Sequence, residues 1–173
     1  MKNTEIYVVS GDISRVKADA LITAINSGGA WFGGIDGVIK RSAGNFFHGQ
    51  AAKQMPLRNE QTVVALSHST KPEMTFDNVV FVVDDLQSPL RNIVYNGLRA
   101  AAEAGFKTVS LPTIRMGVML GMVEKTAAEA MQETSEGVHK FLKEFPDALD
   151  RISFVVYNDP DLQHELENAL TIV

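Results

Sequence analysis

The stretch ALITAINSGGAWFGGIDG, residues 20–37, joins an apolar segment to a loop that contains five glycines. Ala20–Ile25 has the apolar character of a buried strand, and a helix is expected to begin near Asp36. Glycines leave backbone N–H groups unobstructed, and the N-terminus of a helix carries a partial positive charge. Together these features favour an anion site, above all for phosphate, whereas a surface loop with turn glycines is the alternative. The loop has neither the Gly-Lys-Ser/Thr of a P-loop nor GxGxxG spacing, which disfavours a dinucleotide-type Rossmann site.

The rest of the chain predicts an α/β protein with strands and helices in alternation. Strands are expected at 5–9, 20–25, 62–66, 79–83, 107–111 and 151–157, and helices at 36–43, 45–55, 89–104, 123–141 and 160–170. Alternation through the C-terminal half implies parallel pairing, and adjacent strands in the N-terminal half imply a mixed sheet. We therefore expect a three-layer α/β/α sandwich with a mixed, mostly parallel central sheet, formed as one domain over residues 1–173.

The amino-acid composition argues against several classes of binding partner. The chain of 173 residues has a net charge of −5, which disfavours a general nucleic-acid or anionic-membrane surface. Its longest apolar run, Val79–Val83, is far shorter than a membrane-spanning helix. It has no cysteine, so thiolate metal sites and cysteine nucleophiles are excluded. We expect a cytoplasmic protein with no membrane association.

Ligands of such sheets sit at the carboxyl ends of the strands. Three loops leave strand ends there, at residues 10–13, 26–37 and 113–121, and the end of the last strand at Tyr157-Asn158 should join them. The sequence therefore predicts one cleft lined by segments that lie far apart in the chain.

The motifs of these loops, taken in order, resemble those of the macro domain, an ADP-ribose-binding α/β/α module. Gly11-Asp12-Ile13-Ser14 is similar to the first signature of the family, Gly-Asp-Ile-Thr. Asn26 precedes Asp36 by ten residues, as in the second signature, and the segment GGIDGVI, residues 33–39, fits it closely. The segment 111–121 resembles the second phosphate loop of the family, and the resemblance extends from about Glu5 to Leu170.

The resemblance implies roles for individual residues. Asp12 would accept a hydrogen bond from the adenine amine, with the Ile13 backbone beside it, and Tyr157 would pack against the adenine face. Asn26 would hold the distal ribose through its amide. Asp36 would serve as a distal-ribose or catalytic carboxylate. The alternatives are a turn for Asp12 and Asn26, a helix N-cap for Asp36 and an ordinary strand-end aromatic for Tyr157.

The glycine loops would hold the diphosphate. Gly33, Gly34 and Ile35 are the corresponding positions of the first loop. In the second loop, Gly117, Val118 and Met119 would wrap the diphosphate through backbone donors. Arg115 is a candidate phosphate clamp because its fork matches phosphate oxygens, with a solvent-facing loop residue as the alternative.

The chain departs from the family pattern at positions tied to catalysis. Thr23 replaces an asparagine and can donate one hydrogen bond to a ligand, although a hydroxyl cannot copy an amide. Lys40 replaces a histidine, and Trp31 and Phe32 replace two glycines. These aromatic residues would either close over the distal ribose or fill the cleft.

Three functions therefore stay open: a hydrolase acting on mono-ADP-ribosyl protein or ADP-ribose 1''-phosphate, a non-catalytic reader of ADP-ribose or a nucleotide, and a macro fold with an occluded cleft. The expected partner is ADP-ribose or an ADP-ribosylated protein, without a cofactor.

The chain has two further groups of polar residues with a possible functional role. Asp84 and Asp85 end a predicted strand, either as a solvated strand end or as spare carboxylates near the distal ribose. The four histidines have no partner at metal-ligand spacing, so we predict no metal site and expect them at the surface or in local hydrogen bonds. They are His48, His68, His139 and His164.

Overall fold

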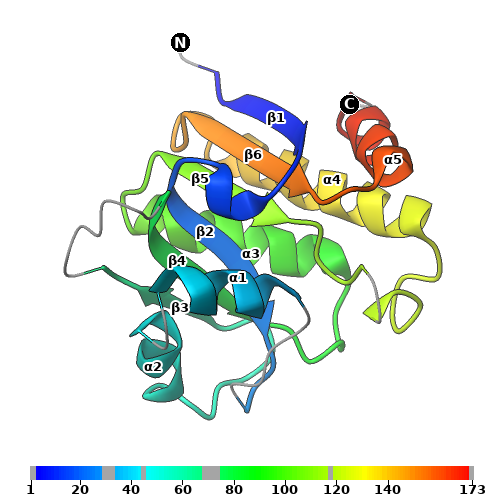
Figure 1. Cartoon of the computed structure of the whole chain (residues 1–173). Helices are drawn as coiled ribbons and strands as arrows, with labels where there is room; N and C mark the ends of the chain where they lie inside the picture. Colours follow the sequence, from blue (N-terminus) through cyan, green and yellow to red (C-terminus); the bar gives the residue numbers. More distant parts are fainter. Residues whose placement is uncertain (1–2, 29–33, 44–45, 68–74, 117–118, 172–173) are drawn as a thin grey trace.

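The computed structural model describes residues 3–28, 34–43, 46–67, 75–116 and 119–171, and its centre is a six-stranded sheet (Figure 1). In spatial order the strands are β1 (Glu5–Ser10), β6 (Arg151–Val156), β5 (Thr108–Pro112), β2 (Ala18–Ile25), β4 (Phe76–Val83) and β3 (Thr62–Ala65). The first five pair in parallel, and β3 pairs antiparallel with β4. The predicted mixed, mostly parallel sheet is thus confirmed.

Helices cover both faces of this sheet (Figure 1). One layer consists of α3 (Leu90–Glu103), α4 (Ala127–Glu144) and α5 (Pro160–Thr171), and the other of α1 (Gly34–Ala43) and α2 (Phe46–Ala52). Successive side chains of a strand point to opposite faces, so Ile22 of β2 packs into the first layer while Leu21 and Ile25 pack into the second. The three-layer α/β/α sandwich is therefore confirmed.

Helix α3 lies unusually close to the sheet. A β-carbon at Gly97 would come within 2.6 Å of Ile22 Cγ2 and 3.1 Å of Val82 Cγ2. Only glycine permits this approach without a shift of the neighbouring side chains. The close packing fixes the N-terminus of α3 beside the carboxyl end of β4.

Helices α3 and α4 begin later in the chain than the sequence predicts. Helix α4 begins at Ala127 rather than 123, because Thr126 caps it by accepting a hydrogen bond from Glu129 N at 3.1 Å. Helix α3 begins at Leu90, and the side chain of Ser88 does not cap it. Instead, Leu90 N donates to Glu124 Oε2 at 3.0 Å, so a carboxylate from a distant loop satisfies this helix end.

The parallel strands place their carboxyl ends at one edge of the sheet. Gly11 follows β1, Asn26 follows β2, Asp84 follows β4, Thr113 follows β5 and Tyr157 follows β6. The loops expected to form a ligand site therefore leave the sheet from the same edge.

Candidate functional site

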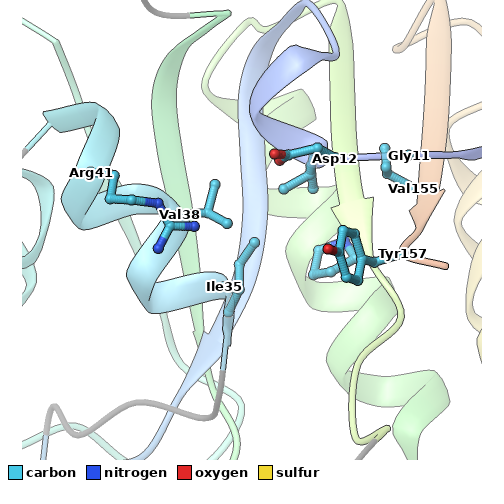
Figure 2. A pocket seen from close by; sticks show the side chains of 9 residues that line it. Gly11, Asp12, Ile35, Val38, Arg41, Val155 and Tyr157 are labelled. Atoms are coloured by element: carbon cyan, nitrogen blue, oxygen red, sulfur yellow. The ribbon is translucent and has the colours of Figure 1, made fainter.

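A cavity of about 420 Å³ opens at this edge, between the turn after β1, the end of β6 and one face of α1 (Figure 2). It is lined by Gly11, Asp12, Ile13, Ile35, Val38, Arg41, Pro112, Val155 and Tyr157. Four residues expected at a ligand site, Asp12, Ile13, Ile35 and Tyr157, are thus brought together from three distant parts of the chain.

Asp12 supplies the carboxylate of this cavity. It follows β1 and caps η1, a 3₁₀ turn at Ile13–Arg15, and its Oδ1 accepts hydrogen bonds from Ser14 N at 2.9 Å and Ser14 Oγ at 2.7 Å. These two bonds, with a smaller contribution from the positive charges of Arg15 and Arg41, lower the pKa of Asp12 below its ordinary value. Within the described ranges, both hydrogen bonds to this side chain go to Oδ1, and they fix the orientation of the carboxylate at the cavity wall.

The walls beside Asp12 are apolar. Ile35 and Val38 face the cavity from α1, and Figure 2 shows the Tyr157 ring opposite them, at the end of β6. Tyr157 is 78% exposed, so the protein itself covers little of its ring. A slot with an apolar wall, an exposed aromatic ring and an ionised carboxylate at its edge suits a flat heteroaromatic ring that carries an amine.

Several lining residues were missed in the sequence. Val38 and Arg41 follow Ile35 at intervals of three residues, which places the three on one face of α1. This spacing within a predicted helix was a signal that could have identified them. Pro112 and Val155 carry no comparable signal, because they line the cavity only through their places at strand ends, whereas Gly11 belongs to the loop 10–13 that was expected at the cleft.

The first glycine loop is described in part. Asn26 is half-buried, and its Oδ1 accepts a hydrogen bond from Gly28 N at 3.0 Å, which closes a local turn. Gly34 is the first residue of α1, and Asp36 lies in its first turn. Gly33, Trp31 and Phe32 lie outside the described residues, as does the placement of the Asp36 side chain.

Thr23 lies within β2 and is only 2% exposed. In the second glycine loop Met119 is half-buried, and its carbonyl accepts a hydrogen bond from Met122 N at 3.2 Å. Gly117 and Val118 lie outside the described residues. The roles expected for these residues toward a diphosphate or ribose stay predictions.

Arg115 was expected either to clamp a phosphate or to face solvent, and the structure places it differently. Its side chain is buried, and its Nε and Nη2 donate to Asp84 Oδ2 at 2.9 Å and Oδ1 at 2.7 Å. Burial alone would lower the pKa of Arg115, but the hydrogen bonds and charges of Asp84 and Glu124 outweigh it and raise the pKa. The fork that suggested a phosphate clamp is thus occupied by protein carboxylates, and Arg115 does not face solvent either.

Asp84 is neither of the two things expected of it, a solvated carboxylate at a strand end or a spare carboxylate near the distal ribose. Asp84 is 1% exposed and paired with Arg115, so it is neither solvated nor presented to a ribose. Asp85 Oδ1 accepts a hydrogen bond from Ser27 N at 2.8 Å, which ties the first glycine loop to the end of β4. Both carboxylates therefore hold backbone segments of the site edge.

Among the residues that the structure describes, no cluster of three or more His, Asp or Glu side chains has the arrangement of a metal site. His48 is buried in α2, with its ring centroid 5.0 Å from that of Phe81, so of its two expected placements, at the surface or in a local hydrogen bond, the surface is excluded. In the same described part of the chain, no helix is both long and apolar enough to cross a membrane.

A mostly parallel sheet between two helical layers, with a cleft at the carboxyl ends of its strands, defines the class of α/β ligand-binding modules. Residues 22–131 match the macro domain family, and the chain belongs to that family. The resemblance carried by the Gly-Asp-Ile and Gly-Gly-Ile-Asp-Gly motifs is thereby confirmed.

Individual relatives show how far this similarity reaches. The chain is 31% identical over 170 residues to an O-acetyl-ADP-ribose deacetylase of Enterobacter sp. (strain 638), covering 92% of this chain and 90% of that protein. It is 24% identical to an ADP-ribose glycohydrolase of Xenopus laevis, covering 92% of this chain and 38% of that protein. A Trypanosoma brucei macrodomain, solved in complex with ADP-ribose, superimposes with a TM-score of 0.78 at 22% identity, covering 96% of this chain and 69% of that chain.

Proposed function

We propose that this chain binds ADP-ribose, or a close derivative, in the cavity between Asp12 and Tyr157. The observation that carries the proposal is the pairing of a fixed, ionised carboxylate with an apolar slot in one cavity of about 420 Å³. The adenine ring would lie between the α1 face and the Tyr157 ring, and its exocyclic amine would donate to Asp12 Oδ2. Guanine and hypoxanthine carry an oxygen in place of this amine, so the contact selects adenine over them.

The remainder of the ligand would extend along the glycine loops. Ile35 lines the cavity and belongs to the first turn of α1, whose N-terminus offers backbone donors to a diphosphate. Gly33 and Gly34 precede it, and Gly117, Val118 and Met119 would close over the diphosphate from the second loop. Asn26 would contribute at the distal ribose, at the carboxyl end of β2.

Hydrolysis of an ADP-ribose linkage is the second candidate function. It is supported by Asp36, which lies beside Ile35 in the first turn of α1, and by relatives named as a deacetylase of O-acetyl-ADP-ribose and an ADP-ribose glycohydrolase. Asp36 would orient or deprotonate a water molecule at the distal ribose. Because Lys40 and Thr23 replace family residues near this position, we expect narrow or slow turnover.

Calorimetric titration of the protein with ADP-ribose tests the binding proposal. We expect saturable binding with adenine-containing ligands, and absence of heat and of NMR shift changes with ADP-ribose would refute it. The same preparation, incubated with mono-ADP-ribosylated protein, ADP-ribose 1''-phosphate and O-acetyl-ADP-ribose, tests hydrolysis. Binding without turnover of any of the three would leave a non-catalytic reader.

A further inference from the structure

Arg115 is the centre of a buried polar network at the edge of the proposed site. Beyond its two bonds to Asp84, its Nη1 donates to Glu124 Oε1 at 2.9 Å and its Nη2 donates to the Ser88 carbonyl at 2.7 Å. The side chains of Arg115, Asp84 and Glu124 are 2%, 1% and 4% exposed. Four of the five guanidinium N–H groups are thus directed to protein acceptors away from solvent.

This network closes the base of the second glycine loop. Arg115 lies within this loop and Glu124 follows it, and their ion pair, with Nη1 2.9 Å from Oε1, joins the two segments. Arg115 also adopts a left-handed backbone conformation, with φ of 65°, which a non-glycine residue keeps only where its surroundings enforce it. The direction in which the loop leaves β5 therefore depends on the contacts of this one side chain.

The same network fixes the loop to rigid parts of the fold. Asp84 joins Arg115 to the end of β4, and Glu124 Oε2 accepts from Leu90 N at the start of α3. Asp85, next in the chain, holds Ser27 N of the first glycine loop. Both loops of the site edge are thus tied to the segment between β4 and α3.

Buried ion pairs often add little stability compared with apolar residues of similar volume, and their best-attested role is to specify one arrangement. We propose that Arg115, Asp84 and Glu124 are positioning residues that set the second glycine loop for the diphosphate of the ligand, without contacting it. This inference rests on the proposed function. It implies that the network controls affinity for the diphosphate and leaves recognition of the adenine ring at Asp12 and Tyr157 unchanged.

Two conservative variants separate the contribution of the network to diphosphate affinity from the recognition of adenine. Arg115→Lys keeps the positive charge but removes the fork, and Glu124→Gln keeps one acceptor oxygen for two donors, Arg115 Nη1 and Leu90 N. The control is Arg91→Lys, which alters an exposed ion pair between α3 and α4, where Arg91 Nη1 lies 3.1 Å from Glu133 Oε1. ADP and adenosine are the probes, measured by calorimetry and by NMR shift titration, with circular dichroism as the check of folding.

We expect both network variants to bind ADP about tenfold more weakly, as for the loss of one strong hydrogen bond, while their adenosine affinity changes less than about twofold. Arg91→Lys should match the parent for both ligands. If the network variants bind ADP as tightly as the parent, or lose equal affinity for ADP and adenosine, the positioning role is overturned. In either case, binding by the parent still supports the proposed function. If both network variants unfold, the network serves the stability of the fold, and the positioning role is overturned as well. A parent that binds neither these two probes nor ADP-ribose would refute the proposed function itself.

Discussion

The Asp12 carboxylate and the Tyr157 ring line the same cavity, although one follows the first strand of the chain and the other follows the last (Figure 2). β1 and β6 are paired in parallel, with Ser10 opposite Val156, so the two residues that follow these strands emerge at the same edge. The Gly11 N–H also donates to the Val156 carbonyl at 3.0 Å, which fixes the turn that carries Asp12. The sheet itself thus brings a hydrogen-bond acceptor and an aromatic ring to one slot.

Tyr157→Ala should weaken ADP-ribose binding by about 1–3 kcal/mol, because an exposed ring that stacks on a base is lost. Tyr157→Phe, the matched control, should keep most of the affinity. The free energy of unfolding should hardly change in either variant, since Tyr157 is 78% exposed. Calorimetry and urea unfolding measure the two effects, and undiminished affinity in the alanine variant would exclude stacking on Tyr157.

Binding of the adenine moiety should be insensitive to mild acid. The pKa of Asp12 lies below its ordinary value because of the two hydrogen bonds from Ser14, so the carboxylate stays ionised where a free aspartate, with a pKa of about 3.9, begins to protonate. The stability that Asp12 contributes is likewise present above the unfolded-state pKa and is lost as the pH falls through the folded-state pKa.

The ADP affinity of the parent relative to that of Asp12→Asn should therefore be flat from pH 7 to about pH 5 and fall only in stronger acid. The Asp12→Asn variant cannot titrate at this position but experiences the same protonation of the ligand. Comparing the two proteins at each pH therefore isolates the contribution of the Asp12 carboxylate. A parent that loses affinity relative to this variant already between pH 7 and 5 would contradict the lowered pKa.

Arg115→Met should destabilise the fold by about 3–5 kcal/mol, because Asp84 and Glu124 would stay buried without their cationic partner. The control Arg91→Met removes an exposed ion pair and should cost less than about 1 kcal/mol. Adding Asp84→Leu to Arg115→Met should recover part of the loss, since one unpaired buried charge is removed. Urea unfolding of the four proteins measures these differences, and equal losses at Arg115 and Arg91 would contradict the burial of the network.

Asp36→Ala separates catalysis from binding. If Asp36 acts on water at the distal ribose, release of ADP-ribose from modified protein should fall by about 10²-fold or more, while affinity for ADP-ribose changes little. Asp77→Ala is a suitable control, because it removes an exposed carboxylate from β4, outside the proposed site. Equal turnover by the parent and Asp36→Ala would show that Asp36 is not a catalytic residue.

Much of the fold could be predicted from local sequence patterns. The apolar run at Ala20–Ile25, the turn at Gly11-Asp12 and the order of strands and helices were sufficient for the sheet class and for the loops that meet at its edge. The cavity was predicted in part, because Ile13, Ile35 and Tyr157 occupy positions adjacent to strand ends or to the glycine loop.

The network around Arg115 could not be predicted in this way. From sequence alone, an arginine in a glycine-containing loop could face solvent, bind a phosphate or pair with a carboxylate. Which of these occurs depends on where β4 and α3 place Asp84 and Leu90. The same tertiary contact explains why 123–126 is not helical: Glu124 is held by Arg115, and Thr126 supplies the cap of α4.

The most direct test of the account is the affinity of the parent and of Asp12→Ala for ADP-ribose, with ADP and IDP as a second pair of ligands. IDP carries a carbonyl oxygen, which only accepts hydrogen bonds, where adenine carries its amine, so the donor to Asp12 is lost at that position. We predict that Asp12→Ala weakens ADP-ribose binding by about 1–3 kcal/mol and abolishes the preference of the parent for ADP over IDP. Equal ADP-ribose affinity in the two proteins, with the same ratio of ADP to IDP binding, would contradict adenine recognition by Asp12.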